Sequence, residues 1–241
     1  MSKHKCIKVS SFGSLQHFRK EDKPKNGGKR CLDCKVEPTC AYSAKKIYLD
    51  PKPESAIFPM NAVCDIEDTG TSYYYHLKKE IETGPYGKCV YETDNNVCDN
   101  QVVNFEFDNG STASLTMIAY SKDMCQRKTV LYGTKGQLQW DDFKDYSIQH
   151  YDFLTQNFQI IDCEEENPGW GHGGSDFFII DSFVKAVATK DESYITTGPQ
   201  ASLNSHLLTF AAEHSRVSGQ VVDLTEDSKL ESVNVNVVLS I

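Results

Sequence analysis

Three cysteines within residues 30–40 have the type and the spacing of metal ligands. Cys31 and Cys34 form a CxxC pair, and Cys40 follows in the same loop. Thiolates at this spacing bind zinc, and a tetrahedral structural zinc site needs a fourth ligand. The side chains that the fold could bring to that position are Cys6, Cys64, His17 and His76. The sequence predicts a zinc site on Cys31, Cys34 and Cys40, and the alternative is a loop of reduced, partly buried thiols.

A glycine-rich segment, Gly-Trp-Gly-His-Gly-Gly-Ser-Asp at residues 169–176, runs directly into an expected helix. A dinucleotide-binding loop would need glycine at position 176, where Asp176 stands, and an apolar strand just before it. The segment instead lets His172 and Asp176 project from a helix N-terminus, which suits hydroxyl-rich or anionic ligands. His172 and Asp176 are therefore the predicted substrate-binding residues. In the alternative, Asp176 only caps the helix and His172 only completes the loop.

A third polar segment, residues 91–101, carries several carboxylates and amides that could hydrogen-bond a sugar or could simply form a turn. The sequence contains no P-loop, nucleophile elbow, HExxH helix or recognisable Ser/His/Asp order. No catalytic residue is assigned.

The composition bounds the remaining function classes. The 241 residues carry 34 acidic and 25 basic side chains, a formal net charge of −9, which disfavours nucleic-acid and anionic-membrane partners. The sequence shows neither a long apolar run nor a secretory leader, so we expect no membrane association. Nine cysteines cannot all pair in disulfides, which favours a reducing compartment and the cytoplasm.

The elements that must position these residues follow from periodicity. Residues 6–18 predict a strand, residues 19–61 an extended Cys-rich loop, and residues 71–82 a helix that buries Tyr74, Leu77 and Ile81. Residues 101–107 and 112–120 predict a hairpin, and further strands are expected at 128–132, 137–140, 146–151 and 158–161.

Two helices and a short strand complete the pattern. The first helix begins with Ser175 as its N-cap. The second follows Thr197, is predicted to bury a stripe that includes Leu203 and Ala211, and ends before Gly219. Residues 221–224 predict a closing strand, and residues 225–241 a peripheral tail. The fold class is α+β, with residues 1–224 forming one domain: a mostly antiparallel open sheet with helices packed on one face.

Several of these segments resemble a known family. The order of motifs is similar to the C-terminal domain of Gfo/Idh/MocA oxidoreductases, nearest to the streptomycin-biosynthesis-type and inositol 2-dehydrogenase-like members. The motifs lie at residues 8–18, 30–34, 40–44, 84–91, 133–138, 171–176 and 219–224.

The resemblance implies an NAD(P)-dependent enzyme acting on sugars or polyols, in which this part shapes the substrate site and the oligomer. The family's glycine fingerprint, its Glu-Lys-Pro segment and its Asp/His pair have no counterpart in this sequence, so no role passes to Lys23 of Asp22-Lys-Pro24. We expect a substrate-binding and oligomerisation half that homo-oligomerises through its sheet and neither binds NAD(P) nor turns over alone. The alternative is a non-catalytic assembly module that pairs with itself or with a full-length relative.

Overall fold

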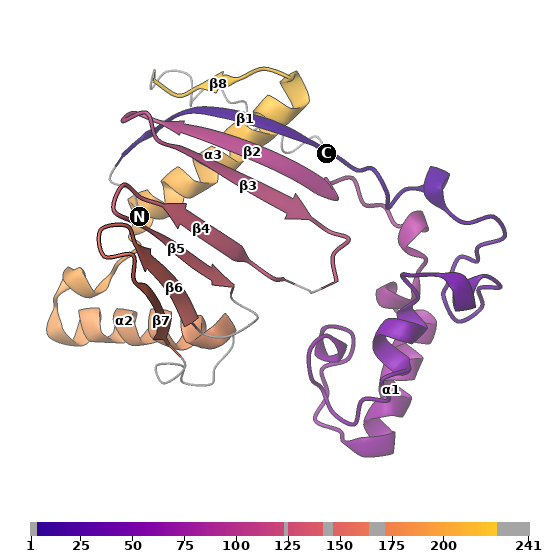
Figure 1. The fold of residues 1–241 in the computed structure, drawn as a ribbon. Coiled ribbons are helices and arrows are strands. Elements are labelled where there is room, and N and C mark those ends of the chain that lie inside the picture. The colour runs from indigo at the N-terminus through magenta and orange to yellow at the C-terminus, as the bar shows by residue number, and fades with distance from the viewer. Residues whose placement is uncertain (1–3, 123–124, 142–146, 164–171, 226–241) are drawn as a thin grey trace. The chain divides into compact units, whose positions relative to one another are not determined.

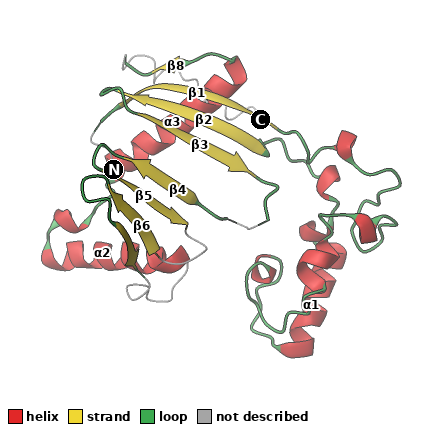
Figure 2. Cartoon of the chain, in the orientation of Figure 1, coloured by secondary structure: helices red, strands yellow, loops and turns green. Residues whose placement is uncertain are grey.

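The computed structural model describes residues 4–122, 125–141, 147–163 and 172–225 (Figure 1). The strands form two antiparallel sheets accompanied by helices (Figure 2), which confirms the predicted α+β class. The expectation of a single sheet was wrong. The four strands between residues 128 and 162 form one sheet, and the strands at residues 6–14, 100–107, 112–118 and 222–223 form the other. The connection from residue 118 to residue 128 is longer than a hairpin turn, so it does not fix the next strand beside the last.

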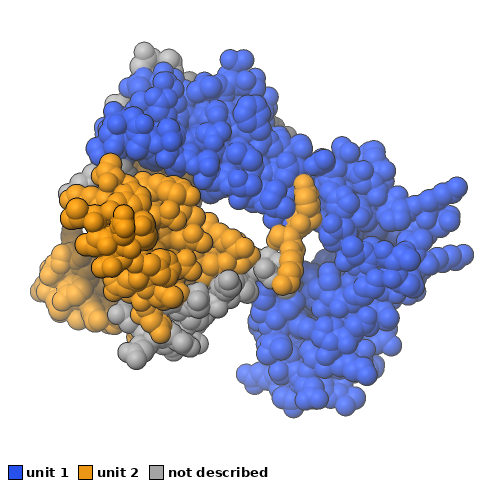
Figure 3. Space-filling model, in the orientation of Figure 1, with its two compact units in different colours: residues 1–119, 210–241 blue, residues 120–209 orange. Residues whose placement is uncertain are grey.

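The chain divides into two compact units, residues 1–119 with 210–241 and residues 120–209 (Figure 3). The sheet of the first unit has the order β3-β2-β1-β8. Its strands are β1 (Cys6–Ser14), β2 (Asn100–Phe107), β3 (Thr112–Ile118) and β8 (Val222–Asp223). The predicted hairpin between β2 and β3 and the closing strand β8 are confirmed.

The helix α3 (Pro199–Ser218) covers this sheet with its last turns. Ala211, Ala212 and Ser215 are buried there, and the Ser215 hydroxyl accepts a hydrogen bond of 3.0 Å from the backbone N–H of Ser11 in β1. The predicted burial of Ala211 is confirmed. Leu203, expected in the same stripe, is 51% exposed, because the buried residues of α3 all belong to its last turns.

Between β1 and β2 the chain makes an excursion, residues 15–99, with a core of its own. Its main helix α1 (Gly70–Thr83) buries Tyr73, Leu77 and Ile81 completely, at the spacing of one helix face. Tyr73 takes the buried place predicted for Tyr74, which is only partly buried. The rest of the core comes from residues 31–64 and consists of Cys31, Ala44, Leu49, Met60 and Cys64.

Short turns make up the remainder of the excursion, as predicted for a loop-rich segment. One π-helical turn spans Lys45–Leu49. The 3₁₀ turns span Lys20–Asp22, Glu37–Thr39, Met60–Ala62, Pro85–Gly87 and Val90–Glu92.

The second unit contains the predicted meander of β4 (Lys128–Tyr132), β5 (Gly136–Asp141), β6 (Ser147–Asp152) and β7 (Phe158–Asp162). Two 3₁₀ turns, His172–Gly174 and Glu192–Tyr194, flank the helix α2 (Ser175–Thr189). The N-cap of α2 is Gly174 rather than the predicted Ser175. Among the described residues, no helix has the length and the apolar content needed to cross a membrane.

Candidate functional site

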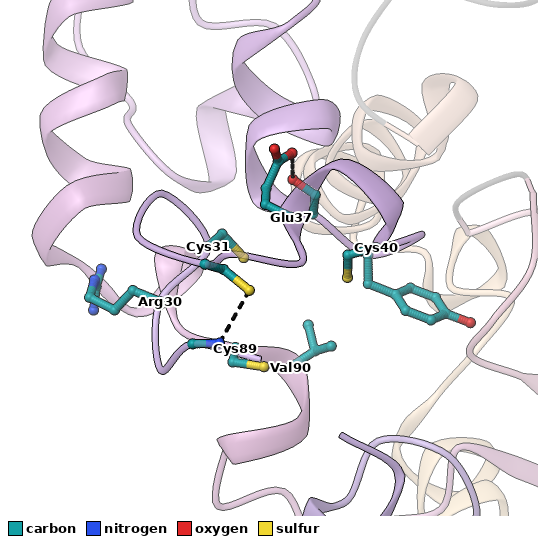
Figure 4. A pocket seen from close by; sticks show the side chains of 10 residues that line it. Arg30, Cys31, Glu37, Cys40, Cys89 and Val90 are labelled. Carbon is teal, nitrogen blue, oxygen red and sulfur yellow. Dashed lines mark hydrogen bonds between the residues drawn. The ribbon is translucent and has the colours of Figure 1, made fainter. Parts of the chain in front are cut away.

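Four cysteines of the excursion line one cavity, of about 20 Å³. They are the predicted Cys31, Cys34 and Cys40, and in addition Cys89. Figure 4 shows Cys31, Cys40 and Cys89 pointing into the same hollow. The four alternatives considered for a fourth ligand do not line this cavity. The structure therefore joins the three predicted residues and adds one that sequence reasoning missed.

Backbone pairing brings Cys89 to the CxxC segment. Arg30 and Lys88 form an antiparallel bridge, the N–H of Cys31 donates to the carbonyl of Gly87 at 2.9 Å, and the N–H of Cys89 donates to the carbonyl of Lys29 at 2.9 Å. No spacing rule links Cys89 to a cysteine about fifty residues earlier. The sequence held only an indirect indication that the two cysteines belong together, since Cys31 and Cys89 each lie in a segment that carries the family resemblance.

The surroundings of Cys31 in the cavity favour the protonated form of its thiol. Burial raises the pKa of the Cys31 thiol, and the neighbouring Cys89, Cys40 and Cys34 raise it further. A backbone hydrogen bond at Ala44 lowers this pKa but does not outweigh the other causes. A buried thiol with a raised pKa is a poor nucleophile. In the described parts of the chain, no three or more His, Cys, Asp or Glu side chains already stand in a metal-holding arrangement. The metal site therefore stays a prediction.

Arg30 fixes the wall of the cavity to the end of α1. Its guanidinium donates hydrogen bonds to the carbonyl oxygens of Ile81 at 2.9 Å and Gly84 at 2.6 Å, which are carbonyls that a helix end leaves without partners. Lys23, to which no catalytic role was given, forms a hydrogen-bonded ion pair with Glu92 that raises the pKa of Lys23. Both cations have structural partners.

Asp99 is the most completely enclosed carboxylate of the described chain, with 1% of its surface exposed. It accepts hydrogen bonds from the backbone N–H groups of Gln16, His17 and Phe18, at 2.9, 2.6 and 3.1 Å. Burial alone would raise the pKa of Asp99, but these bonds and one from Asn100 outweigh burial and lower it to about 2. The carboxylate therefore holds the end of β1 and does not face a ligand.

The sequence leaves residues 91–101 open between a sugar-binding segment and a turn, and two of their polar side chains have partners inside the protein. Besides Asp99, Tyr91 is buried and donates or accepts a hydrogen bond of 3.1 Å with Nε2 of His17. The His17 ring also lies edge-on to Tyr91 and close to Tyr42, with centroids 5.4 and 5.2 Å apart. These side chains close a polar and aromatic cluster that joins β1 to the excursion.

The predicted pair His172 and Asp176 does come together. Nδ1 of His172 lies 2.9 Å from a carboxylate oxygen of Asp176 at the start of α2. Both side chains are more than half exposed, and the cavity described above does not include them. Residues 169–171 of the glycine-rich segment lie outside the described residues. The pair is thus formed, and its role in binding substrate stays a prediction.

No family model and no curated protein matches the chain. A solved oxidoreductase domain protein from Kribbella flavida is 16% identical with a TM-score of 0.49, over 92% of this chain and 47% of that one. An oxidoreductase from Agrobacterium radiobacter, in complex with NAD+, L-tartaric acid and magnesium, is 17% identical with a TM-score of 0.45, over 55% of this chain and 40% of that one.

A levoglucosan dehydrogenase, in complex with NADH and L-sorbose, is 18% identical with a TM-score of 0.45, over 60% of this chain and 41% of that one. The chain thus spans less than half the length of each of these oxidoreductases. Identities and TM-scores this low do not establish membership of a family.

Proposed function

We propose that this chain supplies the substrate-binding and oligomerisation half of an NAD(P)-dependent sugar or polyol oxidoreductase of the Gfo/Idh/MocA type. The observation that carries the proposal is the meeting of four motif segments, which supports treating them as one functional unit. His17 of residues 8–18 contacts Tyr42 of residues 40–44 and Tyr91 of residues 84–91. Cys31 of residues 30–34 pairs through its backbone with Gly87 of residues 84–91.

In this proposal, cofactor binding and hydride transfer belong to a separate nucleotide-binding domain. Hydride transfer requires a nicotinamide ring held against the substrate carbon, and holding it is the task of a nucleotide-binding domain. The paired strands of the described residues are all antiparallel, so these residues contain no parallel βαβ unit for a dinucleotide. We therefore expect no turnover by the 241-residue chain alone.

In this proposal His172 and Asp176 bind the substrate. An imidazole and a carboxylate provide a donor and an acceptor for adjacent hydroxyl groups, and both side chains are exposed enough to exchange their mutual bond for bonds to a polyol. Their place at the start of α2 adds the free N–H groups of a helix N-terminus.

Titration of the chain with inositol and related polyols, followed by ligand-observed NMR, tests this assignment. We expect weak binding that Asp176→Ala and His172→Ala abolish, and no binding of NADH in a parallel fluorescence titration. The matched control is Asp191→Ala, another exposed carboxylate of the same unit, which bonds only to Ser193. Turnover of a polyol by this chain alone, or polyol binding that neither site variant alters, would contradict the proposal.

A second candidate, a self-associating assembly module, is favoured by one face of the second sheet. The strand register places eight uncharged side chains on that face in two rows, next to a third row that carries charges. The uncharged rows are Val130, Gln139, Gln149 and Ile160, and Tyr132, Gln137, Tyr151 and Phe158. The charged row contains Lys128, Asp141, Ser147 and Asp162. Tyr132, Phe158 and Ile160 are each at least 60% exposed, and exposed apolar side chains that lie together are typical of interfaces.

Both candidates self-associate, so the polyol titration distinguishes them, and sedimentation velocity tests the self-association that the second one requires. An assembly module is expected to sediment as a dimer or larger species that the double variant Y132S/I160S converts to monomer. The exposed Leu203→Ser on α3 serves as the control. A wild-type chain that stays monomeric at all concentrations would exclude self-association as its function.

A further inference from the structure

The cavity lined by Cys31, Cys34, Cys40 and Cys89 has the donor set of a structural zinc site. We propose that it binds one Zn²⁺ ion through these four thiolates, with Cys89 as the fourth ligand. The inference stands independently of the proposed oxidoreductase role, because it concerns how the excursion is held together.

The backbone already holds the ligands in two adjacent turns. The N–H of Cys34 donates to the carbonyl of Cys31 at 3.2 Å, which closes the CxxC turn, and the N–H of Cys40 donates to the carbonyl of Glu37 at 3.0 Å. The bridge between Arg30 and Lys88 then sets Cys89 beside that turn. In addition, the N–H of Gly28 donates to Sγ of Cys34 at 3.2 Å, which stabilises negative charge on that sulfur.

The size of the cavity favours a single ion over a cluster. Its volume of about 20 Å³ accommodates roughly one water-sized body. A cubane iron–sulfur cluster is also held by four cysteines, but it would have to fit several iron and sulfide atoms between them. A zinc ion needs only the four sulfurs at about 2.3 Å.

Cations near the ligands would offset part of the net charge of −2 on a zinc ion with four thiolates. Arg30 lines the cavity, as does the carboxylate of Glu37. The ammonium group of Lys23, which is ion-paired with Glu92, interacts electrostatically with Cys89 and Cys34. The ammonium group of Lys46 donates to the carbonyl oxygen of Cys40 at 3.0 Å.

Zinc binding would also draw the sulfurs together. As placed, the four side chains line the cavity without forming a closed metal-holding group. On binding, each S–H bond is replaced by an S–Zn bond and four protons leave to solvent. Rotation about the Cα–Cβ bonds moves the sulfurs inward while the paired backbone stays in place.

The ion would connect two parts of the excursion. Cys31 belongs to the core around Leu77 of α1, whereas Cys89 lies on the segment that leads to Tyr91 and onward to β2. A metal shared by both segments restricts their separation and contributes its binding free energy to folding.

The test uses the full 241-residue chain, purified without chelator and dialysed against metal-free buffer. We expect elemental analysis to find about one zinc ion per chain. Replacement by Co²⁺ is expected to give the intense charge-transfer and tetrahedral bands of a four-thiolate site. The variant Cys89→Ser should lose the ion, whereas Cys89→His, which restores a ligand, should keep zinc with a shifted cobalt spectrum. The control Cys6→Ser removes a half-buried thiol outside the cavity and should bind zinc as the wild type does.

Three results would overturn the proposal. These are a wild-type chain that binds no zinc, a Cys89→Ser chain that retains it fully, and a purified chain that contains iron and acid-labile sulfide. The cobalt spectrum of the wild type counts thiolate ligands without any substitution, so fewer than four thiolates would also overturn the four-thiolate site, even if Cys89→Ser fails to fold.

Discussion

The excursion buries apolar side chains of its helix, whereas the second unit leaves apolar side chains of its helix exposed. In the excursion, Tyr73, Leu77 and Ile81 are completely enclosed by the loop that surrounds α1. In the second unit, α2 leaves Ile179 and Phe183 more than half exposed. A loop-rich segment can thus be internally complete, while a segment of regular strands and helices presents apolar surface of the kind that binds a partner.

The largest effect expected in the excursion comes from Gly87→Ala. A methyl group there would overlap the carbonyl oxygen of Ile81 and crowd the guanidinium of Arg30, so the paired backbone would have to move. We expect a loss of about 4 kcal/mol in the local free energy of unfolding. Hydrogen exchange read by mass spectrometry over residues 28–91 measures it.

Gly198→Ala in the second unit is the matched control. A methyl group at Gly198 meets no atom within 4 Å. Its exchange should be unchanged or slightly slower, because alanine restricts the unfolded chain. If the two variants behave alike, the close packing ascribed to the excursion is wrong.

A second contrast compares two aliphatic residues on helices. Leu77→Ala removes a fully buried side chain from the core of the excursion and should cost about 3 kcal/mol. Ile179→Ala on α2 removes a side chain that is 70% exposed and should cost less than about 0.5 kcal/mol. Urea unfolding followed by local hydrogen exchange reports both. A large loss in the free energy of unfolding on Ile179→Ala would mean that another surface covers this side of α2 in solution.

The buried carboxylate of Asp99 should make the stability of the junction between β1 and the excursion depend on pH. Its pKa of about 2 in the folded chain lies below the ordinary 3.8, so the carboxylate stabilises the fold above about pH 4 and loses that contribution as the pH falls towards 2. The shift corresponds to about 2 kcal/mol. Asp99→Asn should therefore be destabilised by about this amount near neutral pH.

Urea midpoints of the wild type and of Asp99→Asn should approach each other below about pH 4 and converge as the pH is lowered towards 2. The exposed Asp191→Asn, whose carboxylate bonds only to Ser193, should show a smaller difference from the wild type. A difference for Asp99→Asn that does not change with pH would show that its ionisation is not the source of stability.

The smallest effect is expected in the two uncharged rows of the second sheet. Tyr132→Ser and Ile160→Ser should each change the stability of the monomer by less than about 0.5 kcal/mol, since both side chains are exposed. If the face pairs with a second copy, the loss becomes larger and depends on protein concentration. Thermal unfolding over a series of concentrations separates the two cases.

The sequence by itself determined the elements with strong local signals. The β2–β3 hairpin follows from alternating residues on either side of an Asp-Asn-Gly turn, and α1 follows from its apolar spacing and the Gly-Pro stop. The same periodicity placed β4 to β7, α2 and α3 within a few residues of their observed bounds. These features depend on neighbours in the chain, so the chain is enough to predict them.

Tertiary structure decided what depends on residues far apart in the chain. Periodicity predicted that Tyr74 enters the core, and this was wrong: the loop that covers α1 buries Tyr73 instead. Neither the burial of Asp99 under the end of β1 nor the approach of Cys89 to Cys31 has a local signal, since each depends on backbone pairing across tens of residues. Sequence spacing could name three of the thiols, and only the fold could supply the fourth.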